Sequence, residues 1–226
     1  MCVDSDGHLR GTYKAQRSVA YVEESVSLED ILKKKLCTFT QKERYNLSIA
    51  LTSSLLQLSH TPWLQESWNK NSIVFLRAKG SSSSSVTAVD VMHPYLTREH
   101  KEINTPVRQR SGEPNDSLKI VALGIMLLEI TYGVPIEDLL RPEDLGPNHM
   151  PNEASYLQAA RRWLMGKEGK GQFSFAFQEA ISYCLKCFVE PGAILSDEAF
   201  AKTIEDRVLR PLEDEMDILL NGPVVK

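Results

Sequence analysis

The sequence predicts a mainly α-helical domain with a buried central helix and a small β-hairpin. The run at residues 120–128 is apolar at every position except Gly124, and a helix that is apolar on all sides belongs at the centre of a core. Amphipathic helical patterns lie on both sides of this run, at residues 40–60 and again after residue 153. Two short strand-like segments flank a serine-rich loop at residues 79–85, which is typical of a hairpin.

The segments before the hairpin are predicted to form one strand and two helices. The stretch "RSVAYVEE", residues 17–24, has apolar and polar residues in the pattern of a strand. In "SLEDILKKKL", Ser27 is followed three residues later by Asp30, which suits the exposed amides and the dipole of a helix start. In "TQKERYNLSIALTSSLLQLSH", Thr40 and Glu43 have the spacing of a capping box, so we expect a helix of about five turns.

The hairpin is predicted from "NSIVFLR" at residues 71–77 and "VTAVDV" at residues 86–91. After it, residues 97–117 form a long polar segment that contains Pro106, Gly112 and Pro114. A structureless loop of about 20 residues inside a compact domain is usually functional or disordered. We therefore expect this segment to be an irregular loop.

The apolar run is predicted to be a core helix and not a membrane span. Glu129 interrupts it, and Gly133 and Pro135 close it short of the roughly 20 apolar residues that a crossing needs. Further amphipathic helices are predicted from "EASYLQAARRWLMG", "SFAFQEAISYCLKCFV" and "SDEAFAKTIEDRVL". Pro211 is expected to kink or end the last of them.

Composition excludes several classes of function. The 226 residues are 42% hydrophobic and 25% charged, with a net charge of −4, so the basic surface of a nucleic-acid binder is missing. The N-terminus has no apolar signal core, and we therefore expect a cytoplasmic protein. Residues 1–17 are expected to be an extension, and residues 18–226 a single domain.

The cysteines predict neither a disulfide framework nor a metal site. Cys184 and Cys187 form a C-x-x-C pair, but the pair falls inside an apolar helical pattern. Neither a second C-x-x-C nor an H-x-x-x-H is present to complete the four ligands of zinc. We expect both thiols to pack in the core, and we expect no cofactor.

The order of the elements and several of their residues resemble the C-terminal lobe of a protein kinase. "YVEESVSLEDILKK" is similar to the kinase hinge and its following helix, and "ERYNLSIALTSSLLQLS" to the long helix before the catalytic loop. "KNSIVFL" is similar to the strand after that loop. The pattern of the central helix of that lobe is kept at Gly124, Leu127, Glu129 and Gly133, with Pro135 one position early. The resemblance covers roughly residues 18–190 and implies a kinase-like C-lobe.

Departures from the kinase pattern imply that this chain is not an enzyme. The stretch in the place of the catalytic base, "QESWN", has no Asp, and Glu66 is the nearest carboxylate. Phosphoryl transfer needs a carboxylate there to position and deprotonate the acceptor hydroxyl. In the place of the metal-binding D-F-G segment, this sequence has Asp90-Val91-Met92, so Asp90 is a candidate cofactor or metal contact. The alternative is that Asp90 is a solvent-facing carboxylate at the end of a strand. The chain also begins at the hinge, so the N-lobe has no counterpart in it.

"SLEDILKKKL", "TPWLQESW", "VALGIMLLEITYG" and "VLRPLEDEMDIL" together resemble a domain family of unknown function from filamentous fungi. Members of that family often follow a helical domain associated with prion inhibition and heterokaryon incompatibility, which implies a regulatory role. Our first hypothesis is a non-catalytic protein-interaction module on a pseudokinase-like C-lobe. The alternative is the C-lobe of a split or truncated kinase that needs an N-lobe in trans. A third interpretation is a helical domain without any kinase relationship.

The face that the N-lobe would cover in a kinase is the candidate interaction surface. Its predicted residues are Tyr21, Val22, Leu28, Trp63 and Trp68. The two tryptophans either dock a peptide, since tryptophan is enriched at interface hot spots, or pack against the long helix. We expect a protein partner or another domain to cover this face, or residues 1–17 to cap it.

Overall fold

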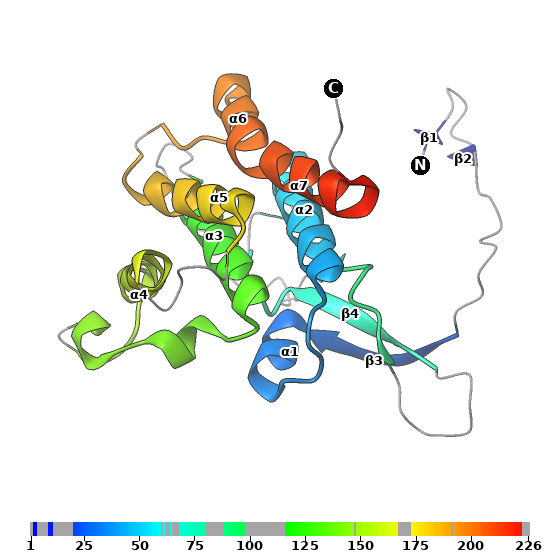
Figure 1. Cartoon of the computed structure of the whole chain (residues 1–226), viewed down its shortest axis with the longest axis horizontal. Helices are drawn as coiled ribbons and strands as arrows, with labels where there is room; N and C mark the ends of the chain where they lie inside the picture. Colours follow the sequence, from blue (N-terminus) through cyan, green and yellow to red (C-terminus); the bar gives the residue numbers. More distant parts are fainter. Residues whose placement is uncertain are drawn as a thin grey trace, which may run out of the picture.

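The computed structural model is mainly helical, with a small antiparallel sheet beside the helices (Figure 1), as the sequence predicts. It describes residues 2–3, 9–10, 20–59, 61, 64, 68–79, 88–97, 116–146, 148–166, 173–190 and 192–222. The helices are α1 (Leu28–Lys34), α2 (Gln41–Leu58), α3 (Ser117–Tyr132), α4 (Glu153–Met165), α5 (Phe175–Lys186), α6 (Glu198–Ile204) and α7 (Arg210–Asn221). The strands are β1 (Cys2–Val3), β2 (Leu9–Arg10), β3 (Tyr21–Ser27), β4 (Ile73–Ala78), β5 (Ala88–Val89) and β6 (Tyr95–Leu96).

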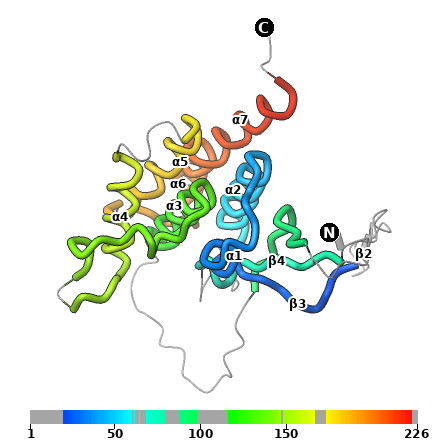
Figure 2. The backbone as a smooth tube through the Cα atoms, turned by 60° about the horizontal axis from the view of Figure 1, so that its bottom comes forward, coloured from blue at the N-terminus to red at the C-terminus, as the bar shows by residue number. Residues whose placement is uncertain are grey.

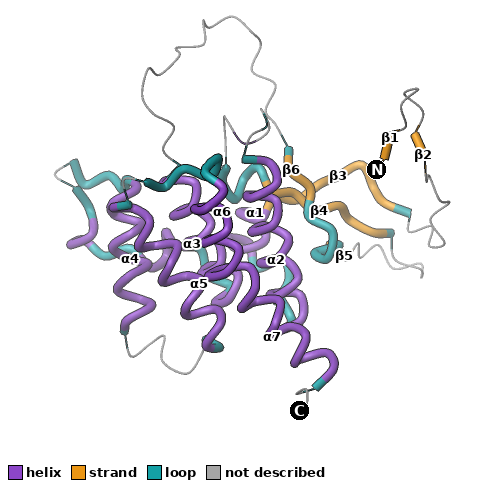
Figure 3. The backbone as a smooth tube through the Cα atoms, turned by 90° about the horizontal axis from the view of Figure 1, so that it is seen from above, coloured by secondary structure: helices purple, strands orange, loops and turns teal. Residues whose placement is uncertain are grey.

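Strand β4 is the centre of a four-stranded sheet that lies at one end of the helices (Figure 3). It pairs antiparallel with β3 and with the two short strands β5 and β6. The β4–β5 pairing confirms the predicted hairpin. The pairing of β3 with β4 was not predicted, because it joins segments far apart in the sequence and depends on the whole chain folding.

Strand β3 extends beyond the C-terminal end of the predicted residues 17–24, of which residues 17–19 lie outside the described part of the chain. It continues to Ser27 because Val26 and Ser27 pair with Phe75 and Val74 of β4. The strand then runs directly into α1, whose N-cap is the same Ser27: its Oγ accepts a hydrogen bond from the Asp30 N–H. The helix start predicted at Ser27 is thereby confirmed.

The start of helix α2 also agrees with the sequence. Thr40 Oγ1 accepts the Glu43 N–H, and the Glu43 carboxylate accepts the Thr40 N–H, so the predicted capping box is present. The apolar face of the helix packs into the core through Tyr45 and Leu55, which are buried. Because its cap and its apolar face are both local features, this helix could be predicted from the sequence.

Helix α3 is the buried central helix. Ile120 and Leu127 have no exposed surface, and α2, α4 and α5 all contact this helix. It ends at Gly133, which adopts a left-handed conformation with φ of 68° and donates its N–H to the Glu129 carbonyl, a backbone that glycine adopts without strain. Within the described part of the chain, no helix has the length and apolar character needed to cross a membrane.

The close packing of α3 against α5 depends on Gly124. A Cβ atom placed on Gly124 would lie 2.6 Å from the Cβ of Cys184, far inside a normal contact. Cys184 and Cys187 are both buried, and burial raises the pKa of each thiol, that of Cys187 to about 11. The two cysteines of the C-x-x-C pair therefore pack in the core, as expected.

The C-terminal helical segment continues through Pro211, so of the two predicted effects of this proline, a kink or the end of the helix, the second is wrong. Helix α6 passes into a π-helical turn at Glu205–Leu209, which leads into α7. In this wider turn the Arg210 N–H bonds to the Glu205 carbonyl. Pro211 then stands in the first turn of α7, where the missing N–H is tolerated.

Candidate functional site

Three polar side chains meet on the sheet at the ends of its strands. Tyr21 opens β3, Asp90 follows β5, and His93 lies in the turn before β6. The Tyr21 hydroxyl donates to Asp90 Oδ2 at 2.7 Å, and His93 Nδ1 lies 2.9 Å from the same oxygen. The strand register brings them together, because Ala78 of β4 pairs with Tyr21 on one side and with Ala88 on the other.

The surroundings of Asp90 favour its charged form. Partial burial raises the pKa of this carboxyl, but the hydrogen bonds from Tyr21 and His93 outweigh it, so the pKa lies below its ordinary value of 3.8. The hydrogen bond to Asp90 in turn raises the pKa of Tyr21. Both Asp90 oxygens thus have partners within the protein, and the carboxylate orders the turn that leads to β6.

Asp90 and His93 do not belong to a larger set of ligating side chains among the described residues. Among the residues that the structure describes, no group of three or more His, Cys, Asp or Glu side chains could hold a metal ion. The Asp90 carboxylate is therefore a fixed negative charge next to the Tyr21 phenol and the His93 imidazole. The role of Asp90 as a strand-end carboxylate fits this geometry.

We expect Asp90→Asn to weaken the acid dependence of folding stability. A carboxyl whose pKa is lowered in the folded state contributes stability that is present above its unfolded pKa and is lost as the pH falls through the folded pKa. Wild type should therefore lose more stability than Asp90→Asn between about pH 5 and pH 2. Urea unfolding at several pH values measures this difference.

Asp138→Asn is the matched control, because Asp138 is exposed and its side chain has no hydrogen bond or ion pair with any described residue. It should follow the wild-type pH profile. If Asp90→Asn also follows that profile, the bonds from Tyr21 and His93 do not contribute to stability.

Two tyrosines give the sheet an open aromatic surface. Tyr21 is 37% exposed and Tyr95 of β6 is 47% exposed, while Val22 is half-buried. The next residues of β3, Glu23 and Glu24, are also exposed. We call Tyr21, Val22, Glu23, Glu24 and Tyr95 the sheet surface.

Other residues predicted for the interaction surface are placed differently. Leu28 is fully buried and Trp68 is only 7% exposed, so both belong to the core, and their assignment to the surface is corrected. Leu28 is the first residue of α1, where the helix packs against the sheet, and its aliphatic side chain is more stable there than in water. Trp63 and Glu66 lie outside the described residues, as do residues 98–115 of the long loop.

Glu129 of α3 has a structural role beside Lys70. Lys70 Nζ donates to Glu129 Oε1 at 2.7 Å and to Glu137 Oε2 at 2.6 Å. The Ile136 N–H donates to Glu129 Oε1 at 2.8 Å. Glu129 therefore connects the central helix to the loop before β4 and to the turn that follows Pro135. Pro135 itself is buried.

Burial shifts the pKa values of Glu129 and Lys70. It raises the pKa of Glu129, and Lys70 only partly opposes the effect. Burial also acts to lower the pKa of Lys70, but the two carboxylates outweigh it and the net shift is upward. Glu129 Oε2 is buried and has no hydrogen-bond partner among the described residues, so the cluster depends strongly on the lysine.

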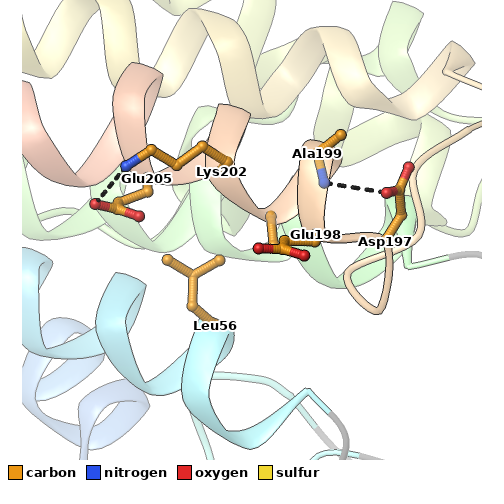
Figure 4. Close-up of a pocket in the computed structure, with 7 residues that line it drawn as sticks. Leu56, Asp197, Glu198, Ala199, Lys202 and Glu205 are labelled. Atoms are coloured by element: carbon orange, nitrogen blue, oxygen red, sulfur yellow. Dashed lines mark hydrogen bonds and ion pairs between the residues drawn. The ribbon is translucent and has the colours of Figure 1, made fainter.

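Two hollows lie away from the sheet surface. An open groove of about 700 Å³ runs between Leu56 of α2 and the α6 region, as Figure 4 shows. Its charged residues are exposed or half-exposed, and two of them already bond each other, since Lys202 Nζ lies 3.0 Å from Glu205 Oε1. A smaller cavity of about 140 Å³ is lined by apolar side chains of α3, by Ile136 and Tyr156, and by Lys70, Glu129 and Glu137. The three charged groups in it already bond one another.

Sequence reasoning missed both Lys70 and Tyr95. A glutamate inside an otherwise apolar helix indicates that a basic partner exists, because a buried charge is rarely unpaired. It does not indicate which of the 26 Lys and Arg residues is the partner. Tyr95 lies in a two-residue strand, too short to produce a periodic signal.

Comparison with known proteins gives one match. The family described as a domain of unknown function (DUF7580) matches residues 3–218. None of the curated proteins and none of the solved structures matches the chain. The family match takes in every element from β3 to α6 and most of α7. The chain therefore belongs to the DUF7580 family of domains of unknown function.

Proposed function

We propose that this domain is a non-catalytic protein-interaction module that binds a partner protein through the sheet surface. The observation that carries the proposal is the exposure of Tyr21 and Tyr95 on a sheet whose polar groups are already ordered around Asp90. Tyrosine supplies a large contact area with a polar tip and is enriched at protein interfaces. A preordered aromatic surface loses little conformational entropy on binding.

The charge of the sheet surface specifies the chemistry of the partner. Glu23 and Glu24 are exposed beside Tyr21 and form no ion pair with any described residue. Charged groups across an interface are arranged to be complementary. The partner surface is therefore basic, with arginine or lysine opposite these two glutamates.

The scaffold of this module is, in our proposal, a degenerate kinase-like C-lobe of fungal origin. Support comes from the element order: β3 leads into α1, α2 precedes the β4–β5 hairpin, and α3 is buried. In a kinase the N-lobe covers the side on which the hinge and hairpin lie, so the partner would take its place. Regulation in heterokaryon incompatibility or related signalling is the role that this scaffold suggests.

The alternative function is the C-lobe of a split kinase, with Asp90 as a metal ligand. A thermal-shift experiment with ATP and Mg²⁺ or Mn²⁺ separates the two, because ligand binding to the folded state raises the melting temperature. The interaction module predicts no shift. A shift that Asp90→Ala abolishes would favour the split enzyme.

The direct test compares partner capture by the wild-type chain and by Tyr21→Ser/Tyr95→Ser. Met165→Ser is the control, because Met165 is 80% exposed and lies on α4, away from the sheet. A protein retained by wild type and Met165→Ser should be lost with the tyrosine variant, and with the purified pair the affinity should fall about tenfold or more. Equal affinity of all three chains would overturn the proposal.

A further inference from the structure

We propose that the end of α7 is a second binding surface, which takes a basic amphipathic helix of a partner protein. Helix α7 carries one apolar stripe that begins in the core and continues past its edge. Leu212 has no exposed surface, Met216 is half-buried against the core, and Leu219 and Leu220 are 41% and 48% exposed. These positions recur at the three- and four-residue spacing of one helical face.

The stripe loses its cover because the helix extends beyond the body of the domain. Figures 2 and 3 show the last turns of α7 extending past the other described helices. Glu215 Oε2 accepts the Tyr45 hydroxyl of α2 at 2.7 Å, and the next residue, Met216, still packs against the core. One turn further, the apolar residues of the stripe face solvent instead of α2.

A second exposed apolar side chain adjoins the same corner. The Tyr45 hydroxyl also lies 3.0 Å from Ser174 Oγ, at the start of α5, and the next residue, Phe175, is 75% exposed. Phe175 thus places an exposed apolar side chain on α5, directly after the residue through which α5 bonds Tyr45 of α2, and the same Tyr45 hydroxyl bonds Glu215 of α7. Apolar surface drawn from two elements is typical of an interaction site and not of a scattered surface residue.

We call the surface formed by Met216, Leu219, Leu220 and Phe175 the α7 seam. The charges beside it indicate the kind of partner that binds there. Glu213 and Asp217 are exposed on its flank and form no ion pair with any described residue. The last turn of α7 contains no basic residue, so the negative end of the helix dipole is also uncompensated. A partner helix with leucine-like residues on one face and lysine or arginine beside them satisfies both requirements.

The same charges argue against a symmetric dimer of this chain. Two copies of α7 packed against each other would bring their carboxylates together, and like charges across an interface are unfavourable. The seam is also separate from the sheet surface, since it is built from α7 and α5 and not from β3 and β6. The two proposals can therefore fail independently.

The test uses two synthetic helical peptides of about 18 residues, one of leucine and lysine in heptad spacing and one of leucine and glutamate. Titration calorimetry measures their affinity, and hydrogen exchange locates them. We expect the lysine peptide alone to bind and to protect the amides of α7. Leu219→Ser/Leu220→Ser should weaken binding about tenfold or more, and Glu213→Gln/Asp217→Asn should reduce its salt dependence.

Asp138→Asn/Glu153→Gln is the control, because it removes equal charge from exposed positions outside both proposed surfaces, in the turn after Pro135 and at the start of α4, and should leave peptide binding unchanged. Circular dichroism checks that each variant is folded. Three results would each overturn the proposal: unchanged affinity in the leucine variant, protection outside α7 and α5, or equal binding of the glutamate peptide. A wild-type dimer that Leu219→Ser/Leu220→Ser converts to a monomer would assign the seam to a second copy instead.

Discussion

Replacement of Lys70 by methionine is expected to destabilise the domain by about 3 to 5 kcal/mol, the cost of leaving a buried charge without its partner. The Glu129 side chain is 1% exposed, and Lys70 is its only charged partner among the described residues. After the substitution, Glu129 keeps one hydrogen-bond donor, the Ile136 N–H. Urea unfolding followed by circular dichroism measures the loss.

The loss of folding stability caused by Lys70→Met should increase as the pH rises. Burial already raises the pKa of Glu129, and removing Lys70 removes the main opposing influence. An acid whose pKa is raised in the folded state gives stability that is present below its unfolded pKa and is lost as the pH rises through the folded value. The deficit of Lys70→Met should therefore be smaller at about pH 5 than at about pH 8.

Two further variants make this prediction specific. Lys34→Met breaks an exposed ion pair with Asp30, whose side chains are 66% and 42% exposed, and should cost less than about 1 kcal/mol. Lys70→Met/Glu129→Gln should be more stable than Lys70→Met alone, since a neutral amide costs less to bury than a carboxylate. Equal losses from Lys70→Met and Lys34→Met would contradict the structural role of the cluster.

Gly124→Ala is expected to destabilise the domain by about 2 to 3 kcal/mol, although alanine has the higher helix propensity. The new Cβ would stand 2.6 Å from the Cβ of Cys184. Both atoms are fixed to helix backbones, so the clash can be relieved only by moving α3 away from α5. The measurement is again the free energy of unfolding in urea.

Substitutions at Cys184 test whether the clash with its Cβ causes the destabilisation by Gly124→Ala. Cys184→Ala keeps the Cβ and should not rescue Gly124→Ala, whereas Cys184→Gly removes it and should recover about 1 to 2 kcal/mol in a double-mutant cycle. Gly146→Ala is the control, because its new Cβ would have only an ordinary contact at 3.5 Å, with Asn152. An additive cycle would mean that the helices do not meet at this point.

Taken together, the two proposals describe a domain with two acidic contact surfaces, one on the sheet and one at the end of α7. Both flanks present carboxylates to a partner, which agrees with the net charge of −4. The rest of the domain contains a packed core with a buried polar tie at Lys70. Such a layout suits a module that joins two partners.

The sequence by itself determined the elements whose signals are local. The caps at Ser27 and Thr40, the apolar run of α3 and the glycine that ends it are each contained within a few residues, and each lies where it was predicted. Helix propensity, capping and periodicity act over one or two turns, so they can be recognised without knowledge of the partner elements.

Only the tertiary structure decided the features that join distant segments. The Tyr21–Asp90 bond spans 69 positions and the Lys70–Glu129 bond spans 59. Neither pair has a local pattern, because strand register and helix packing bring the two residues together. The same reason explains why Leu28 was predicted to be exposed and is buried, and why the α7 stripe leaves the core at Leu219: burial depends on what the rest of the chain places opposite a residue.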